Sequence, residues 1–461
     1  MVEKVRKSLR ESKSARWIAL AFLAFTMLTG YFIADVMAPL KSLLETRHGW
    51  TSTEYGIFTS AYGWFNVFLF MLLIGGIILD KLGIRLTGLG AIIVMIIGTF
   101  LKYYALSKPE LRGQTVYFLW APFDLQVFIA ALGFAIFGVG VEVAGITVSR
   151  GIVKWFKGKE MATAMGLEMA TARIGTALAL AFSPMIAEHF GDVSASVFVG
   201  LLLLIIGFFG FLIYVSMDVR LDKELGADET LLADESEKFR ISNIGKILVN
   251  PGWILIALLC VLFYSAVFPF LKYAADLMVQ KFHIKETVAG LFPSLMPFGT
   301  ILLTPLFGAV YDRVGKGATI MIIGSFLITL VHAVFAIPAL DQSFLAILLI
   351  IILGIGFSLV PSAMWPSVPK IIPENQLGTA YAMIFWVQNW GLMGVPALIG
   401  WVLDTYCKIG VNPNTNAPIY DYTLPMLIFA GFGVIAIFLA FLLKTIDKKK
   451  GYGLELPNIK K

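Results

Sequence analysis

Twelve long apolar runs dominate the amino-acid sequence and constrain the fold more than any other feature. The hydrocarbon core of a bilayer is about 30 Å thick, which a helix of roughly 20 apolar residues can cross. The runs cover residues 17–44, 53–79, 86–106, 125–149, 160–184, 194–217, 251–279, 288–311, 318–338, 344–369, 377–403 and 424–446. Because lipid offers the backbone no hydrogen-bond partners, such runs fold as helices. The sequence therefore predicts an all-α membrane protein with twelve transmembrane helices.

The composition excludes several other classes of protein. Of the 461 residues 58% are hydrophobic and 14% are charged, whereas soluble domains contain about 25% charged residues, so a soluble enzyme is excluded. The two cysteines, Cys260 and Cys407, lie on separate runs and the four histidines are scattered, so we expect no disulfide scaffold and no metal site. No stretch has the spacing of a nucleotide-binding or catalytic motif. We therefore expect no cofactor, no enzymatic activity and no nucleic-acid partner.

The basic residues are distributed unevenly between the two sides of the membrane. If the N-terminus is cytoplasmic, then the tails and every second connection are cytoplasmic, and these hold most of the 36 lysines and arginines. Such an excess marks the cytoplasmic side. The first run is too long for a signal peptide and lacks a small-residue cleavage site, so we expect it to be retained. The sequence predicts a multi-pass membrane protein whose tails, residues 1–16 and 447–461, are both cytoplasmic.

The chain divides into two halves that repeat one another. Residues 218–250 form the longest polar stretch, which we interpret as a cytoplasmic linker between six-helix halves at residues 17–217 and 251–446. Residues 76–85 read Gly-Ile-Ile-Leu-Asp-Lys-Leu-Gly-Ile-Arg, and residues 308–316 read Gly-Ala-Val-Tyr-Asp-Arg-Val-Gly-Lys. Repeats at matching places in two halves are typical of alternating-access transporters.

The two repeated stretches, which we call the gate loops, contain residues that can form contacts between the two halves. Asp80 can accept hydrogen bonds from the N-terminus of a neighbouring helix and pair with an arginine across the seam between the halves, while Gly83 permits a tight turn. Because such a contact forms in one gate state only, it biases the equilibrium between states. The alternative is a plain solvated turn. The expected gating residues are Gly76, Asp80, Gly83, Arg85, Glu160, Asp312 and Gly315.

The pattern G-x-x-x-D-[RK]-x-G-x-R at residues 76–85 resembles the hallmark of the major facilitator superfamily. Residues 155–175, 264–270 and 365–389 resemble the branch typified by the animal lysosomal dipeptide carrier. This resemblance implies a fold of two pseudo-symmetric six-helix halves and the transport of dipeptides without a nucleotide. Glu168 departs from the resemblance, because we expect an uncharged residue there in the animal carrier. The chain also contains no Asn-x-Ser/Thr sequon, so we expect a bacterial inner membrane rather than a lysosome.

Ionisable residues within the runs mark candidate transport pathways, because charge is costly in hydrocarbon. Glu142 and Arg173 lie equally far from the connection at residues 150–160, at a depth of about 20 Å for a rise of 1.5 Å per residue. An anion and a cation at one depth match a zwitterion, because Arg173 offers a fork of donors to a carboxylate and Glu142 accepts an ammonium. The alternative is a structural salt bridge between the two.

The other intramembrane charges have less specific interpretations. Asp35 can line the outer vestibule, take up a proton, or be a hydrogen-bonded helix residue near the following proline. Glu168 is rotated from Arg173 by roughly 140° on the helix, so we interpret it as a structural partner and not as part of one site. Lys272 and Asp276 have the i, i+4 spacing of a surface ion pair, which is the interpretation we favour.

Aromatic and amide residues complete the expected substrate site. Rings bind varied side chains through contact area, and amides bind a peptide bond, although each residue can also be simple packing. The candidates beside Glu142, Arg173 and Asp35 are Tyr31, Tyr264, Trp365, Gln388 and Asn389, followed by Tyr62, Trp64, Phe268 and Tyr381. Trp365 and Phe268 are favoured because each precedes a proline, which frees a backbone carbonyl and loosens the helix where a gate can bend.

These features together predict a transporter that moves dipeptides or similar small zwitterions by alternating access. We expect a functional monomer with a small-molecule substrate, surrounded by lipid, and we leave an accessory subunit and proton coupling versus uniport open. One alternative is a proton-coupled transporter of organic anions, in which Arg173 binds carboxylate and Glu142 or Asp35 takes the proton. The other is a membrane scaffold or sensor that does not transport.

Overall fold

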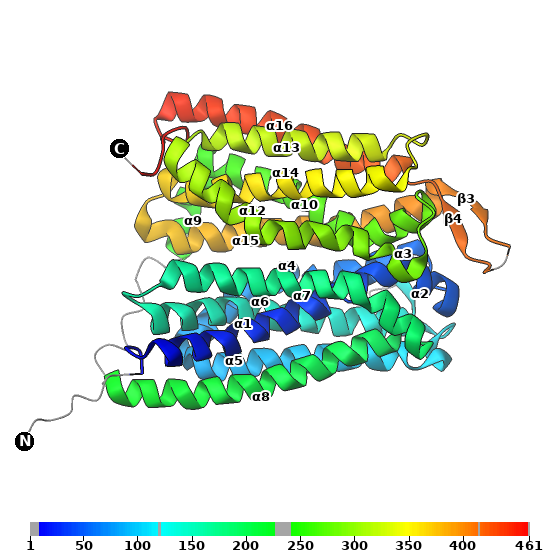
Figure 1. Ribbon diagram of the computed structural model, residues 1–461, viewed down its shortest axis with the longest axis horizontal. Coiled ribbons are helices and arrows are strands. Elements are labelled where there is room, and N and C mark those ends of the chain that lie inside the picture. The colour runs from blue at the N-terminus through cyan, green and yellow to red at the C-terminus, as the bar shows by residue number, and fades with distance from the viewer. Residues whose placement is uncertain (1–8, 119–120, 226–240, 414, 460–461) are drawn as a thin grey trace, which may run out of the picture.

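The computed structural model describes residues 9–118, 121–225, 241–413 and 415–459. Parts of the expected tails and linker, residues 1–8, 226–240 and 460–461, lie outside these described residues. Figure 1 shows two stacked helical bundles, the N-terminal one below in blue to green and the C-terminal one above in green to red. The prediction of an all-α membrane protein is confirmed, and the described strands form only two short antiparallel hairpins.

The N-terminal bundle contains the helices up to α8. Its elements are α1 (Lys13–Asp35), η1 (Ala38–Leu40), α2 (Lys41–His48), α3 (Ser52–Ser60), η2 (Ala61–Gly63), α4 (Trp64–Phe68), α5 (Met71–Leu106), η3 (Pro109–Leu111), β1 (Thr115–Phe118), β2 (Ala121–Asp124), α6 (Leu125–Phe156), α7 (Met161–Phe190) and α8 (Ser194–Leu225). The first expected helix is interrupted by η1, where Pro39 occupies an N-terminal position of the 3-10 turn.

The C-terminal bundle follows the short connecting helix α9 (Ile241–Leu248). Its elements are α10 (Pro251–Gln280), α11 (Glu286–Ala289), α12 (Leu291–Val314), α13 (Gly317–Phe335), α14 (Ser343–Ile371), η5 (Glu374–Gln376), α15 (Leu377–Val402), the π-helical turn η6 (Leu403–Cys407), β3 (Lys408–Val411), β4 (Pro418–Tyr420) and α16 (Thr423–Lys450). Asn250 caps the first helix of this bundle by accepting from the backbone of Gly252 and Trp253.

Eleven helical stretches of the described chain are long and apolar enough to span a membrane. The expected run at residues 53–79 is not among them as a continuous helix, because it is divided among α3, η2, α4 and the start of α5. Phe70 adopts a left-handed conformation (φ 53°) between α4 and α5, and a kink at Gly83 (φ 74°) separates the end of this run from the next. The second passage therefore exists as a broken helix.

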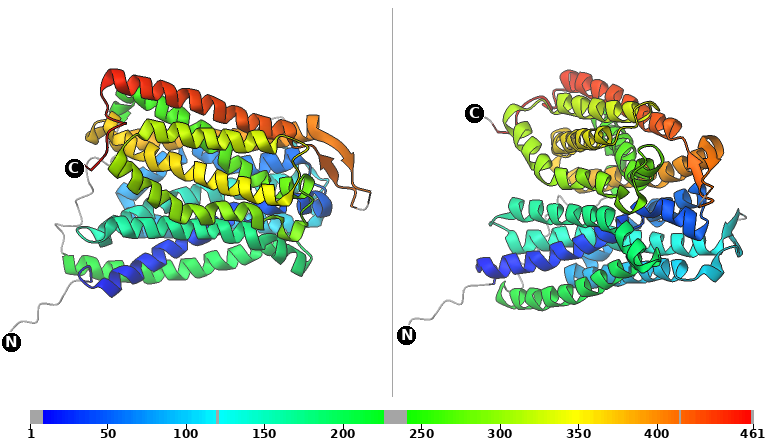
Figure 2. Two further views of the ribbon diagram at one scale, coloured as in Figure 1. Left: turned by 45° about the horizontal axis from the view of Figure 1, so that its top comes forward. Right: turned by 45° about the vertical axis from the view of Figure 1, so that its right-hand side comes forward.

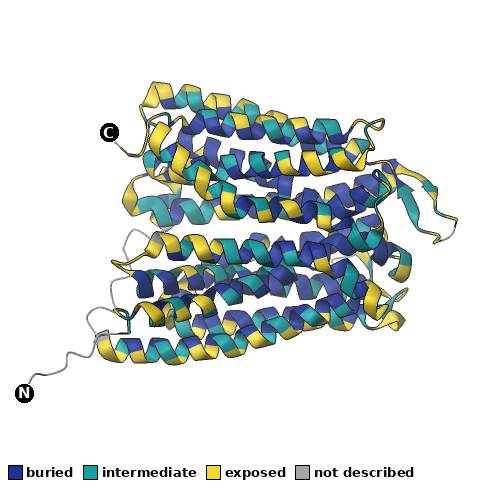
Figure 3. Cartoon of the chain, viewed as in Figure 1, coloured by how far each residue is buried: buried dark blue, intermediate teal, exposed yellow. Residues whose placement is uncertain are grey.

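The two ends of the molecule differ and are named here by their features. The described chain begins and ends at the left in Figure 1, and this is the terminal end; the hairpin β3–β4 and helix α2 lie at the opposite, hairpin end. The right-hand view in Figure 2 shows the two bundles apart. In Figure 3 the exposed residues gather on the outward faces of the helices and the buried ones between them. Exposed apolar residues such as Phe100, Ile206 and Phe438 suit a lipid-facing surface.

Candidate substrate site and gates

Buried ion pairs join the two bundles at the hairpin end. Lys41 Nζ, on α2, donates to Asp276 Oδ2 of α10 at 2.8 Å and to Glu45 Oε1 at 2.7 Å, and all three side chains are almost fully buried. Lys272 Nζ, also on α10, donates to Asp35 Oδ1 at the end of α1 at 2.5 Å. The sequence prediction that Lys272 and Asp276 pair with each other at the surface is therefore wrong. Each faces a residue of opposite charge on the other bundle, where the packed seam excludes water.

Further polar contacts reinforce this seam. The backbone N–H groups of Ser52 and Thr53, at the start of α3, donate to the Asp404 carboxylate at 3.2 and 2.5 Å. This places an anion at a helix N-terminus, where the helix dipole favours it. Tyr422 donates to Asp276, and burial, followed by the Asp276 charge, raises the pKa of the Tyr422 hydroxyl. The hairpin end is consequently closed.

Close backbone approach accompanies these polar contacts. A Cβ added to Gly400 on α15 would meet the Ser52 carbonyl at 2.2 Å, and one added to Gly290 would meet the Leu180 carbonyl at 2.0 Å. Pro184 removes the N–H that would otherwise bond this Leu180 carbonyl within α7. Glycine is needed at both seam positions because any larger residue would force the bundles apart.

Sequence reasoning missed several residues of this closure. Lys41 and Glu45, at the end of the run at residues 17–44, were not among the candidate residues, although their i, i+4 spacing was a signal for an ion pair. Lys102 was likewise not among the candidate residues, yet it is fully buried, donates to the Ile33 carbonyl at 3.0 Å and lies 4.6 Å from the Phe134 ring centroid. Its position inside the apolar run at residues 86–106 was the signal that could have found it.

Asp35 is part of the closed seam. Besides the Lys272 ammonium, it accepts a hydrogen bond from Thr176 Oγ1 at 2.8 Å, so both carboxylate oxygens are engaged. In this state Asp35 is a hydrogen-bonded helix residue with a cation of the other bundle as an unforeseen partner, and its roles in the outer vestibule and in proton uptake stay predictions.

Arg173 of α7 lies among aromatic rings of both bundles. Its guanidinium carbon is 6.0 Å from the ring centroid of Tyr31, 5.4 Å from that of Phe268 and 5.5 Å from that of Phe357. The residue is half-buried, and within the described chain it makes no hydrogen bond and no ion pair. Its N–H donors therefore have no partner, and cation–π contacts hold the guanidinium group in place.

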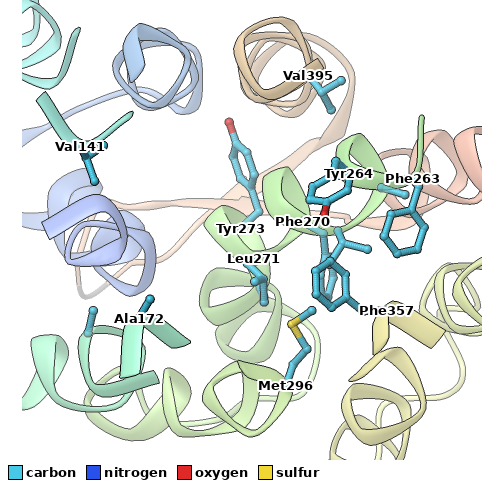
Figure 4. Close-up of a cluster of buried hydrophobic side chains, with 14 of the residues drawn as sticks. Val141, Ala172, Phe263, Tyr264, Phe270, Leu271, Tyr273, Met296, Phe357 and Val395 are labelled. Carbon is cyan, nitrogen blue, oxygen red and sulfur yellow. The ribbon is translucent and has the colours of Figure 1, made fainter. Parts of the chain in front are cut away.

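Figure 4 shows how the bundles meet around this position. Val141 and Ala172, each one residue before an ionisable side chain, lie on helices at one side, and the ring cluster that includes Tyr264 and Phe357 lies at the other. Tyr264 and Phe268 stack with ring centroids 5.4 Å apart, and Phe268 meets Phe357 edge to face. The C-terminal bundle thus contributes the aromatic side of the candidate site.

The carboxylates near Arg173 are not bonded to it. Glu142 accepts a hydrogen bond from Tyr62 Oη at 2.7 Å, and the alternative of a Glu142–Arg173 salt bridge is not realised in this state. Glu168 is 6% exposed, and among the described residues it has no hydrogen bond or ion pair. In this state Glu168 is therefore not bonded as the structural partner that we expected.

The tryptophan on helix α14 is positioned by its neighbours. Trp365 donates from Nε1 to Tyr264 Oη at 3.2 Å and stacks on Phe385 with ring centroids 5.0 Å apart. Tyr381 Oη donates to the Trp365 carbonyl at 3.2 Å. That carbonyl lacks its helical partner because Pro369 has no N–H, so the freed acceptor expected in this helix exists and is already used.

The two amides of α15 are engaged within their own bundle. Gln388 Oε1 lies 3.6 Å from Cys260 Sγ, and Asn389 Nδ2 donates to the Phe385 carbonyl at 3.0 Å. Asn389 Oδ1 is buried without a partner. Trp386 of the same helix reaches across the seam and donates to the Val67 carbonyl at 3.1 Å, which the break of the second passage leaves unpaired.

At the terminal end the gate loops bind within their own bundles. Asp80 Oδ1 accepts from Arg150 Nη1 at 2.6 Å, and Arg85 bonds Asp218 at 2.7 Å and also Asp222. In this state Asp80 therefore pairs with a guanidinium of α6 in its own bundle, and the pairing with an arginine across the seam stays a prediction for another gate state. Asp312 likewise accepts from Asn458, near the end of the described chain.

The remaining predicted gating residues also keep to one bundle. Glu160 accepts from Arg16 at 3.0 Å, and its own backbone N–H and then Arg16 hold the pKa of its carboxyl below the usual value. A Cβ added to Gly76 would meet nothing within 4 Å, so that side of the loop is open. Gly83 and Gly315 have φ values of 74° and 73°, which confirms the tight turns expected there.

The profile of the Major Facilitator Superfamily matches residues 20–396 and 270–455. The chain belongs to the Major Facilitator Superfamily. Its relatives include the lysosomal dipeptide transporter MFSD1 of Mus musculus, 27% identical over 403 residues that cover 85% of this chain and 80% of the relative, and that of Bos taurus, 28% identical with the same coverage. A probable chloroplastic anion transporter 2 of Oryza sativa subsp. japonica is 29% identical over 171 residues, 37% of this chain and 28% of the relative.

Solved transporters of the superfamily share the fold. A bacterial homologue of the human lysosomal transporter Spinster, in an inward-facing and unoccupied conformation, superimposes with a TM-score of 0.68 at 14% identity over 95% of this chain and 98% of its own. The nucleoside transporter NupG gives a TM-score of 0.64 at 17% identity over 92% and 98%. At these identities the likeness concerns the fold alone.

Proposed function

We propose that this superfamily transporter carries dipeptides or similar small zwitterions by alternating access. The observation that carries the proposal is Arg173, whose guanidinium lies at the seam, among rings of both bundles, without a hydrogen-bonded or ionic partner in the described chain. Its planar fork of donors suits a substrate carboxylate. The curated MFSD1 relatives, named as dipeptide transporters, support this substrate class.

Glu142 is the proposed acceptor for the substrate ammonium. One carboxylate oxygen accepts from Tyr62, which leaves the other oxygen for a second donor. The stacked rings of Tyr264 and Phe268, with Trp365 edge-on to Tyr264, supply contact area for side chains of different size. The substrate would therefore contact both bundles, which couples its binding to their relative position.

The differences between the two ends of the molecule indicate which end faces which side of the membrane. We propose that the terminal end faces the cytoplasm, as the basic residues indicate, so that a structure closed at the hairpin end is inward-facing. We further propose a bacterial inner membrane and a functional monomer. For a proton-coupled mechanism Glu142 is the stronger candidate carrier, because Asp35 is committed to Lys272 in this state.

A second candidate function is the transport of organic anions. Two observations favour it: Arg173 has no bonded carboxylate beside it, and Glu142 is already hydrogen-bonded by Tyr62. The rice relative named as a probable anion transporter points in the same direction over part of the chain. In this case a carboxylate alone would satisfy the site.

Affinities for one dipeptide in free, N-acetylated and C-amidated forms test the assignment. Two extended residues span at most about 7 Å, so facing side chains can hold both charged ends of the dipeptide. Arg173→Lys should weaken the forms with a free carboxylate, because it keeps the charge but loses the bidentate fork. Glu142→Gln should weaken the forms with a free amino group, and Tyr62→Phe, which removes only the hydroxyl donor, is the matched control.

The outcomes separate the candidates. Equal losses for free and N-acetylated peptide in Glu142→Gln would remove Glu142 from the site, and tight binding of simple organic acids in competition would favour the anion transporter. If Arg173→Lys bound all forms as the wild type does, then Arg173 would not be the carboxylate site. Accumulation of a neutral dipeptide in liposomes under an acidic exterior would show proton coupling, whereas equal flux in both directions would show uniport.

A further inference from the structure

The chain folds back on itself after its last membrane helix. Helix α16 is followed by Gly451 (φ 72°), and residues 452–459, which we call the strap, then lie across the terminal end of the C-terminal bundle. The Lys316 N–H donates to the Glu455 carbonyl at 3.0 Å, and the Gly317 N–H donates to the Leu454 carbonyl at 2.9 Å. Leu454 is fully buried. The strap is thus packed structure, and Figure 1 shows it beside the terminal end of α16.

The strap also bonds the ends of several helices. Lys370 Nζ, at the end of α14, donates to the carbonyls of Gly453 at 3.1 Å and Leu456 at 2.9 Å. Thr319 donates from its backbone and side chain to the Glu455 carboxylate at 3.0 and 2.8 Å. A segment of eight residues therefore ties together the ends of α13, α14 and α16.

The end of the strap holds the carboxylate of the second gate loop. Asn458 Nδ2 donates to Asp312 Oδ1 at 2.7 Å, and the backbone N–H groups of Asn458 and Ile459 donate to the Asp312 carbonyl at 3.1 and 3.0 Å. In the first gate loop the corresponding Asp80 accepts from Arg150 of a membrane helix. The strap consequently bonds Asp312 in the C-terminal bundle, as Arg150 bonds Asp80 in the N-terminal bundle.

The two gate-loop glycines provide an independent sign of this packing. Gly83 and Gly315 have nearly equal φ values of 74° and 73°, with ψ values of 176° and -137°. A Cβ added to Gly83 would meet nothing within 4 Å, whereas one added to Gly315 would meet strap backbone atoms of Glu455, Leu456 and Pro457 at 2.6 Å. Gly315 thus serves the approach of the strap in addition to the turn.

We propose that the strap is a latch that stabilises the state described here, in which Asp312 bonds the strap and not the opposite bundle, and that Asn458 is its positioning residue; the identity of this state as open at the terminal end rests on the proposed function. Closing that end brings the gate loops toward the opposite bundle, where Asp312 is expected to find new donors. While Asn458 engages this carboxylate, those donors must compete with an existing charge-assisted hydrogen bond. The strap therefore shifts the equilibrium between gate states, whatever the substrate is.

Distances between spin labels at Lys157 and Glu374 test the proposal. These exposed residues lie at the terminal end, one in each bundle. Asn458→Ala should raise the ratio of the closed to the open terminal end about tenfold, the factor expected for one hydrogen bond to a carboxylate. Asn458→Asp should raise it at least as far, because it places a second negative charge beside Asp312.

The glycines supply the matched controls. Gly315→Ala and Gly83→Ala each place a Cβ at a residue with positive φ, but only the former meets the strap, so only the former should free the strap amide hydrogens for exchange. Gly315→Ala should in addition shift the distances. Strap amides that exchange freely in the Asn458 variants while the distances stay as in the wild type would overturn the latch. Distances in Asn458→Asp that match those of the wild type would equally overturn it, because a negative charge beside Asp312 would then leave the gate equilibrium unchanged.

Discussion

The two ends of the seam between the bundles contain the same kinds of charged residue, but the ion pairs join the two bundles at one end and stay within one bundle at the other. At the hairpin end Lys41 and Lys272 reach carboxylates of the opposite bundle in a buried setting. At the terminal end Asp80 and Arg85 bond residues of their own bundle and are partly exposed. Charges that cross the seam close it, and charges that stay within one bundle leave it free to open.

This difference also predicts how strongly each end responds to mutation. Breaking a buried ion pair strands a charge in a medium that solvates it poorly, whereas an exposed pair exchanges its partner for water. We therefore expect substitutions at the hairpin end to change both stability and gate state. Substitutions at the terminal end should mainly change gate state.

Removal of Lys41 has the largest expected effect. Lys41→Met leaves Glu45 and Asp276 as buried carboxylates without their cation, which costs about 3–5 kcal/mol in a typical buried pair. We expect a lower thermal midpoint and an opened hairpin end, measured by thermal unfolding and by label distances across that end. Arg47→Ala, which breaks an exposed pair with Glu188 at the same end but within one bundle, is the control and should cost about 0–1 kcal/mol. Equal losses of stability in the two variants would contradict the expected difference between buried and exposed ion pairs.

The pair of Lys272 and Asp35 should give the next largest effect. Their side chains are 16% and 12% exposed, so Lys272→Met or Asp35→Asn alone should cost about 1–3 kcal/mol by leaving the other group poorly satisfied. The double variant should lose less than the sum, since neither charge remains. Strict additivity in the unfolding free energies would mean that the two residues do not act as a pair.

At the terminal end, Asp80→Asn should change stability by less than about 1 kcal/mol, because its pair with Arg150 is exposed. It should nevertheless alter the populations of inward- and outward-open states, measured by crosslinking across both ends, while substrate binding persists. Arg150→Gln removes the same ion pair from the other side. If both variants shift the populations equally, Asp80 has no further partner in the closed state.

The smallest effect is expected at Glu160. Its lowered pKa means that the folded state favours the carboxylate, so its contribution to stability is present above the unfolded value of 4.5 and is lost as the pH falls through the lower folded value. Thermal unfolding of Glu160→Gln and of the wild type should therefore differ slightly at neutral pH and converge in acid. A difference in stability that grows on acidification would mean that folding does not lower the pKa of Glu160.

Much of the fold could be predicted because hydrophobicity and charge are properties of local sequence. The run that forms α10 and the turns at Gly83 and Gly315 were readable from residue type alone. The second passage was harder to predict, because its break at Phe70 is not coded by a proline and has its unpaired carbonyl bonded by Trp386 of the other bundle. Propensity carries no information about that distant partner.

The sequence by itself determined that the chain crosses a membrane many times and repeats its gate loops. Only the tertiary structure decided which charges meet: Lys41 with Asp276, and Asp35 with Lys272. Helix formation in lipid is enforced by the backbone of each run separately. The choice of an ionic partner instead depends on which remote side chains the packed bundles bring within hydrogen-bonding distance. A local sequence pattern carries no information about such contacts.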